Sequence, residues 1–153
     1  MPIFVNEDIL VNVGVTTGEI ERIIEPRKKP RDKILVVDDD ETLSEFVSRL
    51  LTSEGYEVDT AIDGSDALEK IKGKKYNLLL TGIRMPRIDG FELYKHVKKI
   101  APSLAKKTIV VSGSVKATDT KEFLSRNKLP YMSKPFSAKK LVNKVNRMLT
   151  EDK

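Results

Sequence analysis

The chain has 153 residues, of which 39% are hydrophobic and 33% are charged, which allows one domain with a substantial core. No apolar run approaches the roughly 20 residues that cross a bilayer, and the N-terminus, MPIFVNEDIL, carries acids where a signal peptide carries bases. The sequence has no cysteine and a single histidine, His96, which excludes disulfides and thiolate metal sites and argues against histidine-based zinc sites and catalytic triads. We therefore expect a cytoplasmic protein without a membrane segment.

The formal net charge is +5, and it arises after residue 33, because residues 1–33 hold equal numbers of acids and bases. A basic chain suits nucleic acid or an acidic partner. The sequence shows no helix-turn-helix pattern and no interleaving of aromatic with basic residues, and lysine-rich surfaces are often only solvated. We therefore expect no direct DNA binding.

The first 33 residues divide into two parts. In residues 1–25, valines alternate over positions 11–15, and Thr16 and Glu19 follow with capping-box spacing, which predicts a strand and then a helical turn. This segment is too small to form a domain, and we treat it as an N-terminal extension of unknown role. Residues 26–33, PRKKPRDK, are polar and contain two prolines, which is typical of a linker.

From residue 34 onward, short apolar runs alternate with helical patterns. The runs predict strands at 34–37, 57–61, 78–80, 109–111 and 131–132. The helical patterns predict helices at 43–51, 65–72, 91–100, 116–127 and 138–149, the last capped by Ser137. Strands that are apolar on both faces and separated by helices are typical of a parallel sheet covered on both sides. The sequence therefore predicts an α/β domain over 34–150, with a flavodoxin-like, doubly wound, five-stranded parallel sheet and about five helices.

Polar side chains follow several of these strands, at the edge where sites lie in such folds. They are Asp38, Asp39 and Asp40 after the first strand, Ser112 at the end of the fourth, and Lys134 after the fifth. Clustered carboxylates suit Mg²⁺, and a hydroxyl with an ammonium suits phosphoryl oxygens. Simpler roles are also open: Asp40 as a helix cap, Ser112 in a turn, and Lys134 as a counter-ion of the acids. The convergence of these groups on one edge favours a site.

At these positions the chain resembles the receiver domains of two-component response regulators, the CheY-like superfamily, over about residues 33–150. The motifs ILVVDDD, IRMPRIDGFEL, VVSG and YMSKPF carry the resemblance. It implies metal ligands at Asp38, Asp39 and the backbone carbonyl of Arg84. It also implies a phosphate site and switch formed by Ser112, Lys134 and Tyr131, and a cis peptide bond between Lys134 and Pro135.

The sequence departs from the family at one position. In receivers, the residue four before the proline of the MP motif is an aspartate, which accepts a phosphoryl group from a histidine kinase and binds the metal. Counting back from Pro86 gives Gly82, which has neither a nucleophile nor a carboxylate. Thr81 should face the packed side of the strand, Asp89 should form a turn and Asp63 should begin a helix, so none replaces it. We therefore predict no catalytic residue, and a Mg²⁺ site that is possible but weak.

Two receiver functions follow from the resemblance. The first is a degenerate receiver that is not phosphorylated at the usual position and acts as a protein-interaction module in phosphorelay signalling. It would bind a histidine kinase or a downstream effector through the fourth helix, fifth strand and fifth helix, residues 117–127, 131–133 and 138–149. Basic residues on this face would suit an acidic partner: Lys139, Lys140, Lys144 and Arg147. The second is a phosphoacceptor receiver, stand-alone or terminal in a hybrid histidine kinase, that carries a natural or engineered Asp-to-Gly change.

A third hypothesis is an enzyme. The stretch ILVVDDDETL also matches the hhhhDxDxTL signature of haloacid-dehalogenase-like phosphatases, with Asp38 as nucleophile and Asp40 as acid and base. The final acidic motif of that family should follow an apolar strand beyond the lysine, where this sequence predicts a helix. The phosphatase hypothesis also leaves IRMPRIDG without a role. We therefore predict that the protein is not an enzyme.

Overall fold

The computed structural model of the chain describes residues 31–113 and 115–150. These residues contain a five-stranded sheet in the order β2-β1-β3-β4-β5, in which all neighbours are parallel. The strands are β1 Lys33–Val37, β2 Glu57–Ala61, β3 Leu78–Thr81, β4 Thr108–Ser112 and β5 Tyr131–Ser133. The predicted strand and helical turn of residues 1–25, and the part of the predicted linker before residue 31, lie outside the described residues.

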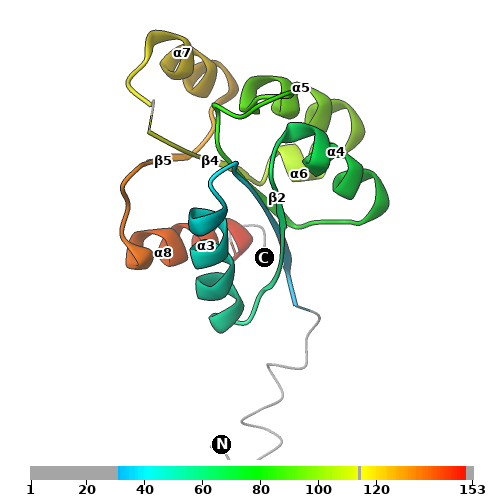
Figure 1. Ribbon diagram of the computed structural model, residues 1–153, viewed down its shortest axis with the longest axis vertical. Helices are drawn as coiled ribbons and strands as arrows, with labels where there is room; N and C mark the ends of the chain where they lie inside the picture. Colours follow the sequence, from blue (N-terminus) through cyan, green and yellow to red (C-terminus); the bar gives the residue numbers. More distant parts are fainter. Residues whose placement is uncertain (1–30, 114, 151–153) are drawn as a thin grey trace, which may run out of the picture. The chain divides into compact units, whose positions relative to one another are not determined.

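Helices cover both faces of this sheet (Figure 1). Those of the described residues are α3 Glu41–Ser53, α4 Gly64–Gly73, α5 Gly90–Ile100, α6 Pro102–Ala105, α7 Thr118–Asn127 and α8 Ala138–Thr150. α3 and α8 pack on one face, and α4, α5, α6 and α7 pack on the other. This arrangement confirms the predicted flavodoxin-like, doubly wound fold. Within residues 31–113 and 115–150, no helix is long and apolar enough to cross a membrane.

The core forms two layers, one on each side of the sheet. Side chains of a strand alternate between its faces, so Leu35 and Val37 of β1 pack under α4 and α5, while Ile34 and Val36 pack against α3 and α8. Each of the four is buried, and such burial contributes about 1.5–3 kcal/mol per side chain relative to exposure. Burial on both faces explains why the sequences of β1, β3 and β4 are mostly apolar rather than alternating.

Aspartates at the ends of three strand-to-helix loops cap the helices that follow. Asp40 accepts from the Leu43 N–H of α3, Asp63 from the Asp66 N–H of α4, and Asp89 from the Glu92 N–H of α5, at 3.1, 2.8 and 3.0 Å. Each satisfies one of the N–H groups that a helix leaves unpaired in its first turn. The capping role of Asp40 and the helix-entry role of Asp63 are thereby confirmed, whereas Asp89 caps α5 where a turn was predicted.

Two features differ from the predicted helices. The sequence analysis did not predict α6, which is a single turn with Pro102 in its first positions, too short to show a helical periodicity. α7 begins at Thr118, two residues later than predicted, and the residue before it, Ala117, has no side chain that can cap a helix. The predicted cap of α8 is confirmed, because the Lys140 N–H donates to Ser137 Oγ at 3.1 Å.

Candidate functional site

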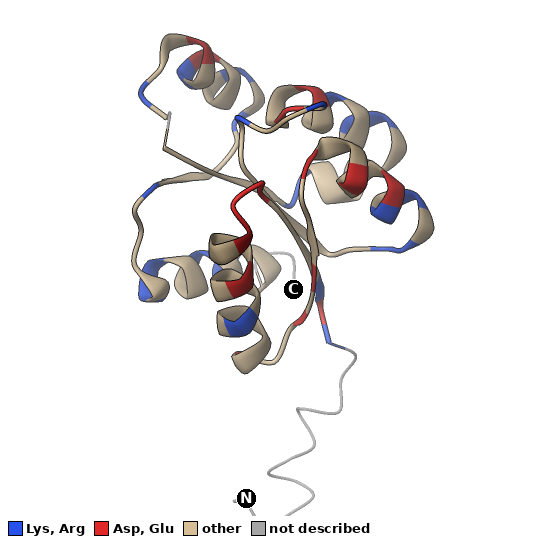
Figure 2. Cartoon of the chain, in the orientation of Figure 1, with Lys and Arg blue, Asp and Glu red and all other residues tan. Residues whose placement is uncertain are grey.

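The carboxyl ends of β1, β3, β4 and β5 bring the predicted site residues to one edge of the sheet. Asp38 follows β1, Gly82 follows β3, Ser112 ends β4 and Lys134 follows β5. Backbone hydrogen bonds extend the strand pairing into the site, since the Gly82 N–H donates to Val37 O at 2.9 Å and the Lys134 N–H donates to Ser112 O at 3.0 Å. Acidic residues gather at the junction of β1 and α3, as Figure 2 shows. The predicted convergence is therefore present.

Asp38 and Lys134 form an ion pair at the centre of this edge. Lys134 Nζ lies 2.8 Å from Asp38 Oδ2, and the Asp38 side chain is 7% exposed while that of Lys134 is 31% exposed. The other carboxylate oxygen, Oδ1, accepts from the Asp40 N–H at 2.9 Å. A buried carboxylate is tolerated when a cation and a hydrogen-bond donor satisfy it. Lys134 is therefore the counter-ion of the Asp38 carboxylate in this structure.

Gly82 lies beside this ion pair, and the backbone conformation at position 82 does not require a glycine. Its φ lies outside the left-handed region. A Cβ built at position 82 would lie 3.3 Å from Asp38 Oδ2 and 3.7 Å from Val111 O, so only the carboxylate would have to shift slightly. At Gly90, by contrast, a Cβ would lie 2.3 Å from Gly82 O and 2.8 Å from Ile83 Cα. Gly90 is therefore needed for close packing, whereas position 82 has room for a side chain.

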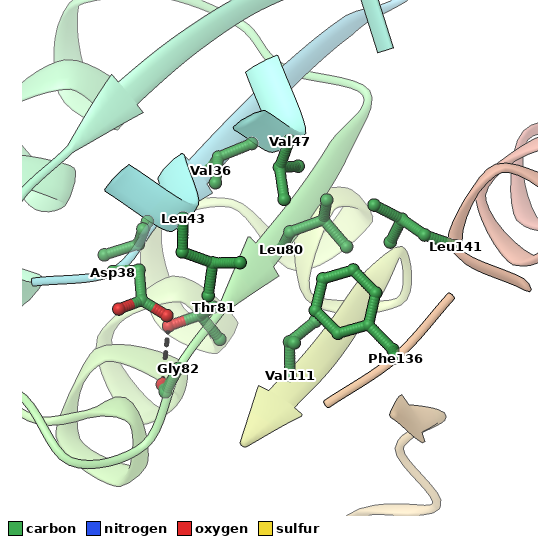
Figure 3. A pocket seen from close by; sticks show the side chains of 11 residues that line it. Val36, Asp38, Leu43, Val47, Leu80, Thr81, Gly82, Val111, Phe136 and Leu141 are labelled. Carbon is green, nitrogen blue, oxygen red and sulfur yellow. Dashed lines mark hydrogen bonds between the residues drawn. The ribbon is translucent and has the colours of Figure 1, made fainter. Parts of the chain in front are cut away.

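A small apolar cavity of about 20 Å³ lies between Gly82 and the α3–α8 side of the core (Figure 3). Its volume is about that of one water-sized probe, and its apolar lining gives a water few partners. The lining residues are Val36, Val37, Asp38, Leu43, Val47, Leu80, Thr81, Gly82, Val111, Phe136 and Leu141. Thr81 is 2% exposed, and its hydroxyl donates to Gly82 O at 2.8 Å. Thr81 is therefore packed, as predicted, and its hydroxyl is engaged by the backbone.

The acidic residues at this edge make a poor Mg²⁺ site. Within the described residues, no three Asp, Glu, His or Cys side chains gather so that they could hold a metal ion. Of the two predicted carboxylate ligands, Asp38 is already bound to Lys134, and Asp39 is exposed. Mg²⁺ demands near-octahedral oxygen coordination and gives up its waters reluctantly. One exposed carboxylate and one paired with an ammonium supply few of the oxygen ligands that Mg²⁺ requires.

The model of the response regulator receiver domain family matches residues 34–146. The chain belongs to this family. The receiver domain is 32% identical to the response regulator receiver protein CpdR of Brucella abortus over 117 residues, 76% of this chain and 96% of that protein. It is 33% identical to the chemotaxis protein CheY of Treponema pallidum over 120 residues, 76% of this chain and 82% of that protein. A CheY-like receiver domain from Methanospirillum hungatei aligns with a TM-score of 0.74 and 31% identity, covering 80% of this chain and 96% of that one.

Family membership establishes the general function. The chain carries a receiver domain of two-component signalling. Receiver domains are generally non-enzymatic signalling modules that interact with histidine kinases or effectors, and they typically bind Mg²⁺ at the phosphorylation site. α8 occupies the region where a haloacid-dehalogenase-like phosphatase would carry a further strand and its last acidic motif, so the described fold gives that alternative no support.

The other predicted site residues lie in β4, in β5 and directly after β5. Ser112 is 4% exposed at the end of β4. The peptide bond between Lys134 and Pro135 is cis, as the resemblance implied. Tyr131, the predicted switch aromatic, begins β5 with half of its surface exposed. The receiver's tyrosine therefore faces solvent beside α8 rather than the core.

Arg84 connects the loop after β3 of the receiver with α7. Its guanidinium donates to both carboxylate oxygens of Asp119, at 3.0 and 3.2 Å, and its Cζ lies 5.7 Å from the centre of the Phe91 ring. The hydrogen bond from Arg84 lowers the pKa of the Asp119 carboxyl from its usual value. The Phe91 ring in turn meets the Phe123 ring of α7 edge to face, with centroids 4.7 Å apart. Sequence reasoning missed this connection, because Asp119 lies 35 residues from Arg84 and outside every motif.

Asp63 has a second role that the sequence did not reveal. It is fully buried, and besides capping α4 it forms an ion pair with Arg87 of the loop after β3. The Gly64 N–H donates to Ile88 O of the same loop at 3.0 Å. Arg87 adopts a left-handed φ of 63°, which is uncommon for a residue with a side chain. The loop that follows Gly82 is therefore held against the start of α4.

A further polar cluster lies along the edge strand β2, away from the site. Lys74 Nζ lies 2.9 Å from both Glu57 and Asp59, and the Tyr76 hydroxyl donates to Asp59 Oδ2 at 2.6 Å. The hydrogen bond from Tyr76 is the main cause that lowers the pKa of Asp59, and burial is the main cause that raises the pKa of Tyr76. The cluster ties the end of α4 to the exposed side of the sheet.

Proposed function

We propose that this receiver domain is a protein-interaction module of two-component signalling that is not phosphorylated at the usual position. The observation that carries the proposal is Gly82, which stands at the end of β3 beside the Asp38–Lys134 ion pair. A phosphoryl group needs a nucleophile at this point, and the hydroxyl of the adjacent Thr81 is buried and bonded to the backbone. The predicted receiver, 34–150, is proposed to begin one residue earlier, because β1 starts at Lys33. The rest of the predicted linker, 26–32, and the extension, 1–25, are proposed to precede it.

The proposed partner surface is the face formed by α7, β5 and α8. A groove on this face is lined by Tyr131 of β5 and by Lys140, Lys144 and Arg147 of α8. α8 carries basic residues along this side, as Figure 2 shows. An exposed aromatic ring next to several cations suits an acidic protein partner, a kinase or an effector. No direct DNA binding is proposed, and the cytoplasmic location stays a prediction.

The proposal is tested by incubating the full chain with acetyl phosphate and Mg²⁺ and measuring its intact mass. We expect no covalent phosphoryl group on this chain. Gly82→Asp should gain one, and Gly82→Asn, which has the same shape without the nucleophile, should not. A stoichiometric gain of one phosphoryl group by the unchanged chain would overturn the proposal.

The second candidate is a phosphoacceptor receiver whose aspartate has been exchanged for glycine. The space at position 82 favours it, because a Cβ there would require only a small shift of the Asp38 carboxylate. Phosphorylation of Gly82→Asp at a rate typical of receivers would support a recent or deliberate exchange. An inert Gly82→Asp variant would show that the pocket has lost more than the nucleophile.

A further inference from the structure

A second groove lies at the opposite end of the sheet from the site, where the strands begin. It is lined by residues 71–76, at the end of α4 and in the turn before β3, and by residues 100–104, at the junction of α5 and α6. Its volume is about 440 Å³. It shares no residue with the α7–β5–α8 face or with the edge that carries Asp38.

Exposed lysines line this groove on its α4 side, where Lys72 and Lys75 belong to the lining. On the α5–α6 side, the exposed Lys98, Lys99 and Lys106 lie before and after the lining residues 100–104 along the chain. None of the five has an ion-pair partner among the described residues. From residue 93 to residue 118 the sequence contains lysines but no aspartate or glutamate. Figure 2 shows these basic segments on α5 and after the end of α4. Lys74 also lines the groove but is paired with Glu57 and Asp59, so the charge of the lining that is not neutralised comes from Lys72 and Lys75.

An apolar side chain lies between these lysines. Ile100 lines the groove and is 47% exposed, and the exposed Pro102 follows it at the start of α6. A single exposed isoleucine on a surface is ordinary. Here it lies inside a hollow and is bordered by cations, which is the composition of an apolar anchor point with a polar rim.

The helix dipole explains only part of the positive charge. Lysines in the last turn of a helix are stabilised by its negative C-terminal end, which accounts for Lys72 of α4 and for Lys98 and Lys99 of α5. Lys75 lies beyond the end of α4, and Lys106 follows the single turn of α6. The helix dipole therefore gives no reason for Lys75, whereas Lys106 is the C-cap residue of α6.

We propose that this groove, lined by Lys72, Lys75 and Ile100, docks an acidic, partly apolar segment of a partner protein. The lysine rim would pair with carboxylates, and Ile100 would contact an apolar residue of the segment. Nucleic acid fits less well, because the groove lining contains no arginine, and its one aromatic residue, Tyr76, is buried and so offers no ring for base stacking. The inference is independent of the proposed function, since it concerns another surface and needs no statement about phosphorylation.

The test measures fluorescence anisotropy of the full chain with two labelled acidic peptides of equal charge, one with leucines between its glutamates and one with serines instead. Lys72→Gln/Lys75→Gln should weaken binding of the leucine peptide about fivefold to tenfold. The matched variant Lys139→Gln/Lys140→Gln loses the same charge from α8 and should change binding less than twofold. Ile100→Gln should weaken the leucine peptide but not the serine peptide. Thermal unfolding of each variant checks that these exposed substitutions leave the fold intact.

Three results would overturn the inference. One is an equal loss of affinity for the leucine peptide in both double-lysine variants, which would mean that the peptide is attracted to the basic protein without a specific site. Another is loss only in the α8 pair, which would place the peptide on the α7–β5–α8 face and leave the proposed function standing. The third is tighter binding, at equal charge and salt, of a double-stranded DNA oligonucleotide or of phosphatidylserine vesicles than of the leucine peptide.

Discussion

Restoring a carboxylate at position 82 tests how the site is held together. In Gly82→Asp, the new Cβ would lie 3.3 Å from Asp38 Oδ2, so the two carboxylates would lie about 4–5 Å apart. Two like charges at that distance repel by about 3–4 kcal/mol at an effective dielectric constant of about 20. Lys134, 2.8 Å from Asp38 Oδ2, offsets part of this repulsion. Relative to Gly82→Asn, which has the same size without the charge, we expect Gly82→Asp to be less stable by about 1–2 kcal/mol at neutral pH.

Urea unfolding of both variants, with and without Mg²⁺, measures this difference. The difference in unfolding free energy between Gly82→Asp and Gly82→Asn should become smaller when Mg²⁺ is added, because the metal binds three nearby carboxylates more tightly than two and so stabilises Gly82→Asp. The unchanged chain and Gly82→Asn should respond little to Mg²⁺. A Gly82→Asp variant that is as stable as Gly82→Asn without Mg²⁺ would refute the argument from like-charge repulsion, and would mean that Lys134 alone neutralises this edge.

Three further predictions concern the same domain. Lys134→Met should cost about 1–3 kcal/mol in urea unfolding, because it leaves Asp38 buried without a cation, and adding Asp38→Asn should recover most of the loss. The pKa of Asp59 is lowered in the folded state, so ionised Asp59 stabilises the fold above its ordinary pKa of about 3.9, and this stabilisation is lost as the pH falls below that value. Unfolding measured at a series of acidic pH values should therefore show a smaller loss of stability in Asp59→Asn than in the unchanged chain. Leu141→Ala should cost about 3–5 kcal/mol of unfolding free energy, because Leu141 is 1% exposed and lines a cavity that the change would enlarge.

The fold could be predicted from the sequence because its signals are local. The central strands β1, β3 and β4 are short runs that are apolar on both faces, and β2, β3 and β5 begin at the predicted residues. The helices with a broad apolar face were predicted to within about two residues, which is the usual uncertainty of helix ends. α6 was missed, because one turn has no periodicity and its Pro102 is equally typical of a loop.

The sequence predicts which chemical groups meet at the site but not the contacts that hold the surrounding loop. The order of residues along the chain places Asp38, Ser112 and Lys134 at strand ends, and parallel strands end together, so their convergence follows from topology. The contacts that orient the loop after Gly82 do not follow from the sequence. Arg84 bonds to Asp119 and Arg87 to Asp63, and such long-range pairs depend on side-chain directions that no local pattern specifies.

The carboxylates at this edge of the receiver are satisfied without a third carboxylate or a metal ion. Asp38 binds an ammonium and a backbone N–H, and Asp63 binds a guanidinium and a helix N-terminus. Unpaired buried carboxylates would destabilise the fold until a metal or a proton arrived, but both have partners within the chain. The fold therefore does not need Mg²⁺ at this edge. It also does not need a glycine at position 82, where a Cβ would require only a slight shift of Asp38. The glycine therefore changes the chemistry of the site, not its packing. Phosphorylation by the phosphodonor and stabilisation by Mg²⁺ should accordingly both appear in Gly82→Asp and be absent from the unchanged chain.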